Sequence, residues 1–151
     1  MTQQLFILTG ASRGMGLAMA QQLLQPGHTL ICMARNSNSQ LTAAVPAGAM
    51  LEQWTVDLSE PAPAAQQLHA WLAGQSAGRY ASATLINNAG VIPRIAPLSA
   101  CASAQDMADQ ARALRVGLEA PMLLTAAFLG ATEGWGAPPH AVARKVLNIS
   151  S

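Results

Sequence analysis

The sequence predicts a single α/β domain, residues 1–151, built on a doubly wound parallel β-sheet with helices on both faces. Short apolar runs alternate with segments of helical spacing along the chain, as in folds made of successive strand–helix–strand units. The runs are apolar throughout rather than at every second residue, which is typical of strands buried on both faces. Right-handed crossovers then favour the strand order 3-2-1-4-5.

Five apolar runs are expected to form the strands, and turn-forming residues bound most of them. They cover residues 5–9, 29–34, 50–56, 83–86 and 145–149. Helices are expected at residues 17–24, 64–72, 104–115 and 118–131. The stretch 36–48 is polar and rich in small residues, and no element is assigned to it. Each cluster of unusual residues lies at the carboxyl end of an expected strand, where such sheets bind ligands.

Composition excludes several classes of protein. Hydrophobic residues make up 51% of the chain and charged residues 10%, and the formal net charge is +1. There is no basic field for nucleic acid and no polybasic run for a membrane surface. Cys32 lies in an apolar run and is expected to be a free buried thiol. No metal site is expected, because the histidines are isolated and no ligand spacing recurs.

No targeting or membrane-spanning segment is expected. The apolar N-terminus lacks a basic region, and the glycines that follow it interrupt the run. No stretch reaches the ~18 uninterrupted apolar residues of a membrane span. A cytoplasmic location is therefore expected.

A glycine-rich turn joins the first expected strand to the first helix. It reads Thr9-Gly10-Ala11-Ser12-Arg13-Gly14-Met15-Gly16. Glycine is needed where the chain turns sharply and where a side chain would block a pyrophosphate, and the helix that follows presents free amides to that anion. An ordinary tight turn would explain the glycines alone, but the strand–turn–helix context favours a nucleotide site. Gly10, Ser12, Arg13, Gly14, Met15 and Gly16 are therefore candidate contacts.

The spacing of this turn resembles that of the short-chain dehydrogenase/reductase family, a group with Rossmann-type sheets, and three later motifs extend the resemblance. Asp57-Leu58 is similar to the family's adenine contact. Asn87-Asn88-Ala89-Gly90 resembles its fourth-strand signature, and Asn148-Ile149-Ser150-Ser151 the end of its fifth strand. The resemblance implies that Asn88, Ala89 and Gly90 line the ribose and nicotinamide side of the coenzyme.

Two arginines predict that the coenzyme is NADP(H). Enzymes that use NAD commonly carry an acidic residue at the end of the second strand, for the ribose 2′-hydroxyl. Ala34 stands there, followed by Arg35 and Asn36. Arg35 can pair with a 2′-phosphate, and Arg13 can approach the same group. The other interpretation is that both are solvated surface arginines.

The resemblance implies a catalytic serine, tyrosine and lysine with a supporting asparagine. Ser151 aligns with the serine. The family's Tyr-x-x-x-Lys pattern follows at positions that lie past the end of this sequence, and Tyr80 is placed too early to substitute. Gly117 stands where the family has the asparagine. The chain is therefore expected to be the amino-terminal part of an enzyme, with its sheet incomplete on the C-terminal side, and to be inactive alone.

Two functions remain open at this point. The first is an NADP-dependent oxidoreductase that transfers hydride between NADPH and a small carbonyl or alcohol, similar to the sepiapterin and benzil reductase branch of the family. As a full-length protein it would be a homo-oligomer. The second is a non-catalytic NADP-binding module or pseudoenzyme, if the natural chain ends at Ser151.

Overall fold

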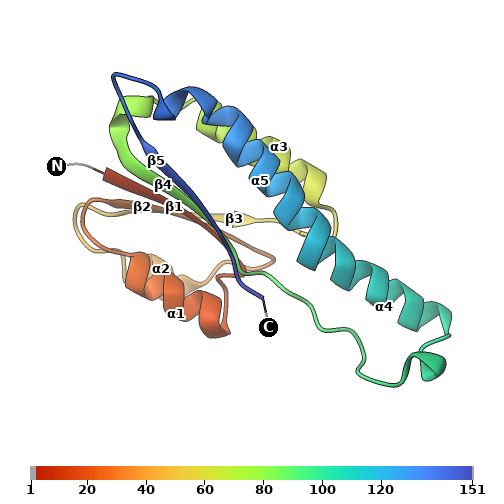
Figure 1. Ribbon diagram of the computed structural model, residues 1–151. Helices are drawn as coiled ribbons and strands as arrows, with labels where there is room; N and C mark the ends of the chain where they lie inside the picture. Colours follow the sequence, from red (N-terminus) through yellow and green to blue (C-terminus); the bar gives the residue numbers. More distant parts are fainter. Residues whose placement is uncertain (1–2, 151) are drawn as a thin grey trace.

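The predicted doubly wound sheet is confirmed in a computed structural model, which describes residues 3–150. Five parallel strands lie in the order β3-β2-β1-β4-β5 (Figure 1). The strands are β1 (Gln3–Thr9), β2 (His28–Ala34), β3 (Met50–Thr55), β4 (Tyr80–Asn87) and β5 (Ala143–Asn148). The order reverses between β1 and β4, so the carboxyl ends of these two strands form the switch point at which such sheets bind ligands.

Helices cover both faces of the sheet. Helices α1 (Gly14–Leu23) and α2 (Ser39–Ala43) lie on one face, and α3 (Pro61–Ala73) and α5 (Ala120–Ala131) on the other (Figure 1). Helix α4 (Ala104–Leu114) continues into α5 through a π-helical segment, η3 (Arg115–Glu119). Short 3₁₀ turns complete the chain: η1 (Ala77–Arg79), η2 (Leu98–Ala100) and η4 (Glu133–Gly136).

Two hydrophobic cores explain why the strands are apolar on both sides. Successive strand residues point to opposite faces, so Ile7 packs beneath α3 and α5 whereas Leu8 packs beneath α1 and α2. The larger core includes Leu68 of α3 and Phe128 of α5, both fully buried. The smaller core is closed by Leu41 of α2. A strand with one polar face would place polar side chains in one of these two cores.

The structure differs from the sequence prediction at two places. The stretch 36–48 contains α2, whose first turn is capped by the side chain of Asn38. The helices expected at 104–115 and 118–131 form one continuous helix, because the predicted break falls on the π-helical segment instead of a loop. The polar sequence of 36–48 hides a five-residue helix. The i→i+5 bonding of a π-helical turn shifts the 3.6-residue apolar spacing, so one continuous helix has the pattern of two.

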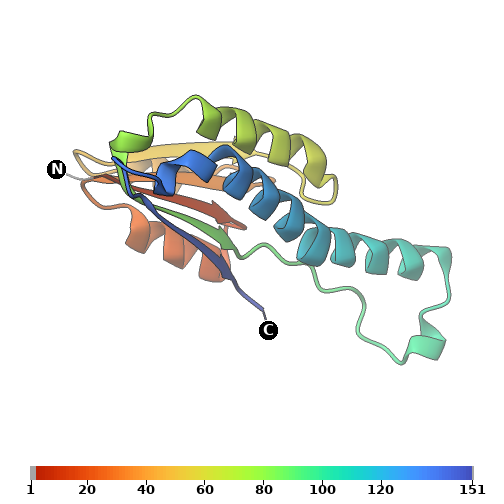
Figure 2. The same ribbon diagram turned by 45° about the horizontal axis from the view of Figure 1, so that its top comes forward.

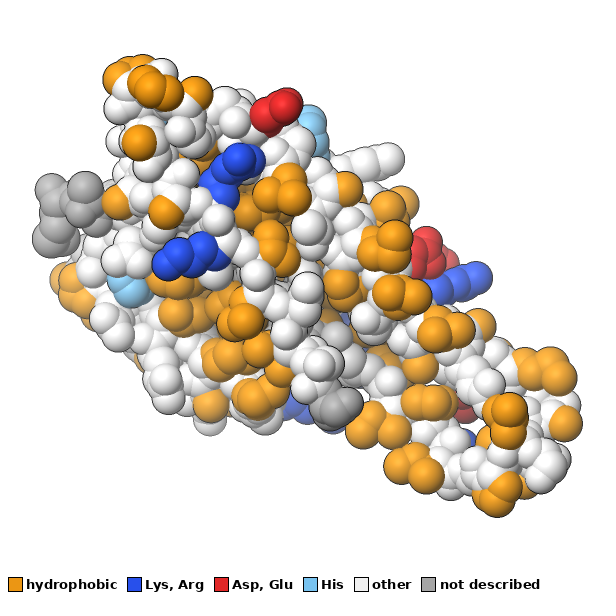
Figure 3. All heavy atoms as spheres, in the orientation of Figure 1, with side chains coloured by type: hydrophobic (Ala, Val, Ile, Leu, Met, Phe, Trp, Pro, Cys, Tyr) orange, Lys and Arg blue, Asp and Glu red, His pale blue; other side chains and the backbone are white. Residues whose placement is uncertain are grey.

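The helix from Ala104 to Ala131 is long and apolar enough, by length and composition, to cross a membrane. Its second half packs against α3 and buries Leu124 and Phe128 in the larger core, so in this fold it is a covering helix of the sheet. Its first half has no buried residue and projects past the carboxyl ends of the strands (Figure 2). Hydrophobic side chains gather on this projecting part (Figure 3), among them Met107 and Leu114.

We predict that Cys32 resists alkylation in the folded protein. The side chain is 3% exposed within the smaller core, and burial raises the pKa of its thiol to about 12. The reactive thiolate is therefore absent at pH 8. Peptide mapping after iodoacetamide treatment should find Cys32 unmodified in native protein and modified in denaturant. Rapid native labelling would show that β2 is less protected than the structure indicates.

Candidate functional site

The glycine-rich turn is joined to the end of β4 through Thr9. The Thr9 side chain is 2% exposed, and its Oγ1 accepts hydrogen bonds from the backbone amides of Asn88 (3.0 Å) and Ala89 (2.9 Å). In return, Asn88 Nδ2 donates to the carbonyl oxygens of Thr9 (3.2 Å) and Gly10 (3.4 Å). These bonds fix two segments almost eighty residues apart in sequence as one unit. Thr9 was not among the predicted contacts, although its place before the first glycine was a usable signal.

Glycine is required at two positions of this turn by close approach. Gly10 has a φ of +72°, and a Cβ there would lie 2.9 Å from Ala89 Cα. At Gly16 a Cβ would lie 1.9 Å from the Gly10 carbonyl oxygen. No side chain fits such a gap, so the first turn of α1 lies directly against the preceding loop. In the described part of the chain no side chain caps α1, which leaves its first amides available to an anion.

A cavity of about 590 Å³ opens over this turn at the switch point. Its lining includes twelve of the thirteen predicted coenzyme contacts: Gly10, Ser12, Arg13, Gly14, Met15, Gly16, Arg35, Asp57, Leu58, Asn88, Ala89 and Gly90. The thirteenth, Asn36, is exposed in the loop after β2 and is not part of the lining. The structure thus brings together residues from four separate segments, because all four follow the carboxyl ends of adjacent strands.

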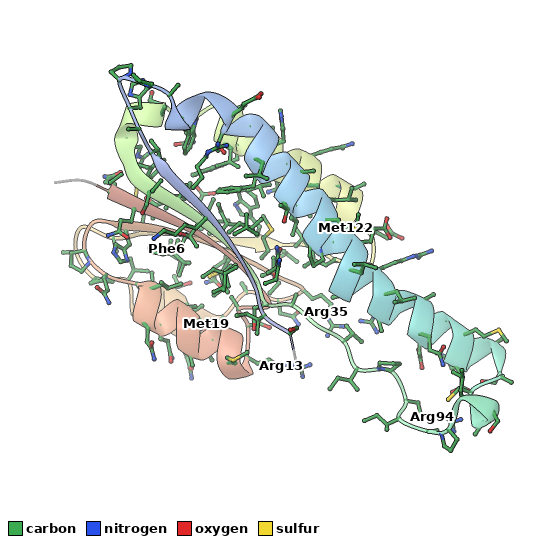
Figure 4. All side chains as sticks on the ribbon, viewed as in Figure 1. Phe6, Arg13, Met19, Arg35, Arg94 and Met122 are labelled. Carbon is green, nitrogen blue, oxygen red and sulfur yellow. The ribbon has the colours of Figure 1, made fainter. Side chains whose placement is uncertain are left out.

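Three arginines surround the cavity. Arg13 begins the first turn of α1 and Arg35 follows β2; both lie at the same end of the sheet (Figure 4). Arg112 enters from the projecting helix α4. The sequence prediction missed Arg112, and the only available signal was its helical spacing of four residues from Val116, which lines the same cavity. The side chains make this end of the cavity a region of positive potential.

Asp57 supplies the negative charge in the cavity lining. Its Oδ1 accepts hydrogen bonds from the hydroxyl (2.7 Å) and the backbone amide (2.9 Å) of Ser59. These bonds lower the pKa of the Asp57 carboxyl, and the charges of Arg112 and Arg35 lower it further. The carboxylate is therefore ionised at neutral pH and can accept a hydrogen bond from an amino group, as adenine presents. The adjacent Leu58 is buried and offers an apolar surface to a flat ring.

A second, larger cavity of about 960 Å³ lies on the other side of Gly90. Its floor is the end of β4 and β5, where Asn87 Nδ2 donates to Asn148 Oδ1 at 2.8 Å. Ser150 is part of its lining. The predicted catalytic serine, Ser151, lies outside the described residues, so its role stays a prediction.

The π-helical segment borders this second cavity through Gly117. This residue holds the position at which the family resemblance implies an asparagine that distorts its helix. The distortion is present in the structure although the asparagine is not. A Cβ added at Gly117 would meet no atom within 4 Å. The backbone irregularity is therefore not caused by the asparagine side chain in this protein.

Tyr80 lies too far from the site to act as an acid. It begins β4, whereas the cavities lie at the carboxyl end of that strand, about 23 Å away at the usual rise per residue. Its ring stacks on Trp135 with centroids 5.8 Å apart. Burial raises the pKa of its phenol, which makes proton release harder still. This placement agrees with the prediction that Tyr80 cannot replace the family's tyrosine.

The class of this protein follows from the fold and the cavity together. A doubly wound parallel sheet, with a glycine-lined cavity over the first helix at its switch point, defines a Rossmann-type α/β fold. The family model described as short chain dehydrogenase matches residues 4–151. The chain therefore belongs to the short-chain dehydrogenase family of oxidoreductases.

Two curated relatives are benzil reductases that form (S)-benzoin. The protein from Bacillus cereus is 30% identical, and the match covers 96% of this chain and 55% of that protein. The one from Bacillus subtilis (strain 168) is 34% identical over 83% of this chain and 47% of its own length. The predicted resemblance to the benzil reductase branch is thus confirmed, and the chain spans about half the length of these relatives.

A solved structure of a metagenomic short-chain oxidoreductase in complex with NADP has a TM-score of 0.72 to this chain and 31% sequence identity. The match covers 99% of this chain and 62% of the other. The likeness extends over all five strands, because nearly the whole of this chain is included.

We predict opposite effects on stability for alanine at two glycines. Gly16→Ala should lower the free energy of unfolding by on the order of 3 kcal/mol, because its Cβ collides with the Gly10 carbonyl. Gly130→Ala in α5 is the matched control, since a Cβ there meets open space. It should raise stability by about 0.5–1 kcal/mol through helix propensity. Urea unfolding of both variants tests this, and a stable Gly16→Ala protein would contradict the close approach.

Proposed function

We propose that this protein is the coenzyme-binding part of an NADP-dependent oxidoreductase that transfers hydride between NADPH and a small carbonyl or alcohol. The observation that carries the proposal is the charge around the first cavity. Ala34 ends β2 at the position where an NAD-dependent protein commonly has a carboxylate, Arg35 follows it, and Arg13 lies at the same end of the sheet. Guanidinium groups form strong charge-assisted bonds with phosphate, so this site favours a 2′-phosphate over a free hydroxyl.

Each segment around the cavity has a distinct part in the proposed binding. The first amides of α1 receive the pyrophosphate, and Gly14 and Gly16 allow its approach. Asp57 and Leu58 hold the adenine. Ser12, Met15 and Asn36 complete the glycine turn and the loop after β2, with Asn36 outside the cavity lining.

The nicotinamide end of the coenzyme would pass Asn88, Ala89 and Gly90 toward the second cavity. Apolar side chains make up much of the lining of that cavity, including Met15, Met122 and Leu129. They suit a hydrophobic carbonyl substrate. In the proposed reaction the coenzyme supplies hydride to the carbonyl carbon, and Ser151 orients the carbonyl oxygen. The tyrosine and lysine implied by the family would supply the proton.

Relatives of this chain support the proposal. Both curated relatives reduce benzil, a diketone, and a similar oxidoreductase was solved with NADP. A small-molecule substrate, a cytoplasmic location and a homo-oligomeric full-length protein are parts of the same proposal. The apolar side chains of Met107 and Leu114, exposed on the long helix outside the second cavity, favour assembly.

We predict that Arg35→Ala weakens NADPH binding about tenfold to a hundredfold, the loss expected for one charge-assisted bond to phosphate. NADH binding should change little, because NADH lacks the 2′-phosphate. Arg144→Ala is the matched control: Arg144 is the second residue of strand β5 and is not part of the cavity lining. Calorimetric titration with both coenzymes measures the effect. Equal weakening of NADPH and NADH would contradict the role of Arg35.

We also predict that a polypeptide of residues 1–151 alone binds NADPH without turnover, because it holds no Tyr-x-x-x-Lys pattern to supply the proton. Absorbance at the NADPH band in the presence of benzil should stay constant while titration still shows binding. Oxidation of NADPH above the rate of a blank would refute the proposal that residues 1–151 bind the coenzyme but lack the residues that supply the proton.

A further inference from the structure

The loop that carries Arg35 is closed by the side chain of Asn38. This residue precedes α2, and its Oδ1 accepts hydrogen bonds from the amides of Gln40 (2.8 Å) and Leu41 (3.4 Å). Such a bond is the ordinary role of asparagine before a helix. The cap involves only Oδ1 of the Asn38 side chain. The amide nitrogen, Nδ2, takes no part in it.

The Nδ2 end of Asn38 reaches the glycine-rich turn. It donates to the carbonyl oxygen of Ser12 at 3.2 Å, a contact across 26 residues of sequence. Ser12 immediately precedes Arg13, whereas Asn38 lies three residues after Arg35. One side chain therefore connects the two backbone segments that present these arginines to the cavity.

Gln53 fixes Asn38 from the opposite side. It lies on β3 facing α2, and its Oε1 accepts from the backbone amide of Asn38 at 2.7 Å. Its Nε2 donates to the carbonyl oxygen of Asn38 and to Thr42 Oγ1, both at 2.9 Å. Both backbone polar groups and both ends of the side chain of Asn38 are thus engaged. A helix cap needs none of the bonds to Gln53.

We infer that Asn38 is a positioning residue that sets the preference of the site for a phosphorylated coenzyme. The inference rests on the proposed function. Arg13 and Arg35 are exposed, so binding must order them, and this ordering lowers the affinity. The loss is smaller when the backbone that carries each arginine is already fixed in the free protein. The bridge from Gln53 through Asn38 to Ser12 provides that fixation. Its loss should weaken binding through the 2′-phosphate and spare contacts to the pyrophosphate, which depend on the first turn of α1.

Asn38→Ser separates the bridge from the cap. Serine caps a helix about as well as asparagine and adds no charge, but its hydroxyl is too short to reach the Ser12 carbonyl. We expect NADPH to bind about tenfold more weakly, NADH to change less than about threefold, and Tm to stay within a few degrees. Ser103→Ala is the matched control, because it removes the cap of α4 at a residue that is not part of the cavity lining. It should lower Tm and leave the ratio of the two affinities unchanged.

A double-mutant cycle with Arg35→Ala tests whether Asn38 acts through the arginine. In that background Asn38→Ser should cost NADPH affinity less than about threefold, since the group it positions is gone. Gln53→Met, which breaks the other half of the bridge with a neutral side chain of similar size, should reproduce the shift in affinity ratio. It also keeps the test decisive if Asn38→Ser folds poorly.

The possible outcomes distinguish a failure of the role of Asn38 from a failure of the proposed NADPH preference. A wild-type protein without preference for NADPH overturns both. A wild-type protein that prefers NADPH, with the same affinity ratio in Asn38→Ser and Gln53→Met, overturns only the inference. A full tenfold loss in the Arg35→Ala background would show that Asn38 acts by another route and also overturns it.

Discussion

The whole site depends on the contact between the glycine-rich turn and the end of β4. The buried hydroxyl of Thr9 accepts hydrogen bonds from two backbone amides after β4. Because Gly10 has no side chain, the backbone of Ala89 can lie directly against it. Because β1 and β4 lie side by side across the point where the strand order reverses, this contact determines where the sheet opens. A side chain at Gly10 or the loss of the Thr9 hydroxyl would separate the two walls of the cavity.

Charge is distributed unevenly around this opening. The first cavity is lined by Arg13 after β1, Arg35 after β2, Arg112 of α4 and one carboxylate, Asp57 after β3. Hydrogen bonds of Asn38 and Gln53 hold the loop after β2 in place. The side formed by β4 and β5 carries asparagines above an apolar groove. An elongated ligand with a highly charged end and an uncharged end matches this division.

At Gly117 of this protein the helix has a π-helical backbone without a side chain that could cause it. The helix has a π-helical turn at Arg115–Glu119, although Gly117 at the centre of this segment has no side chain. Apolar packing on both sides of the segment, by Val116 and Ala120, holds the two halves of the helix in place. The π-helical turn thus lies where the long helix has buried residues on both sides of Gly117. Its chemistry at that point differs from the family pattern, because no amide is presented to the second cavity.

Much of this protein was determined by its sequence alone. Unbroken apolar strands predicted the sheet and its order, because these depend on local spacing and on the handedness of crossovers. The glycine turn and Arg35 predicted seven residues of the cavity lining, and the family resemblance implied five more after the third and fourth strands. The tertiary structure alone decided what depends on distant segments meeting. Arg112 reaches the cavity only because α4 continues into α5 and projects over it, and Asn38 connects to Ser12 and Gln53 only because β2 lies between β1 and β3. Such contacts join residues far apart in the chain, and no periodicity within one segment records them.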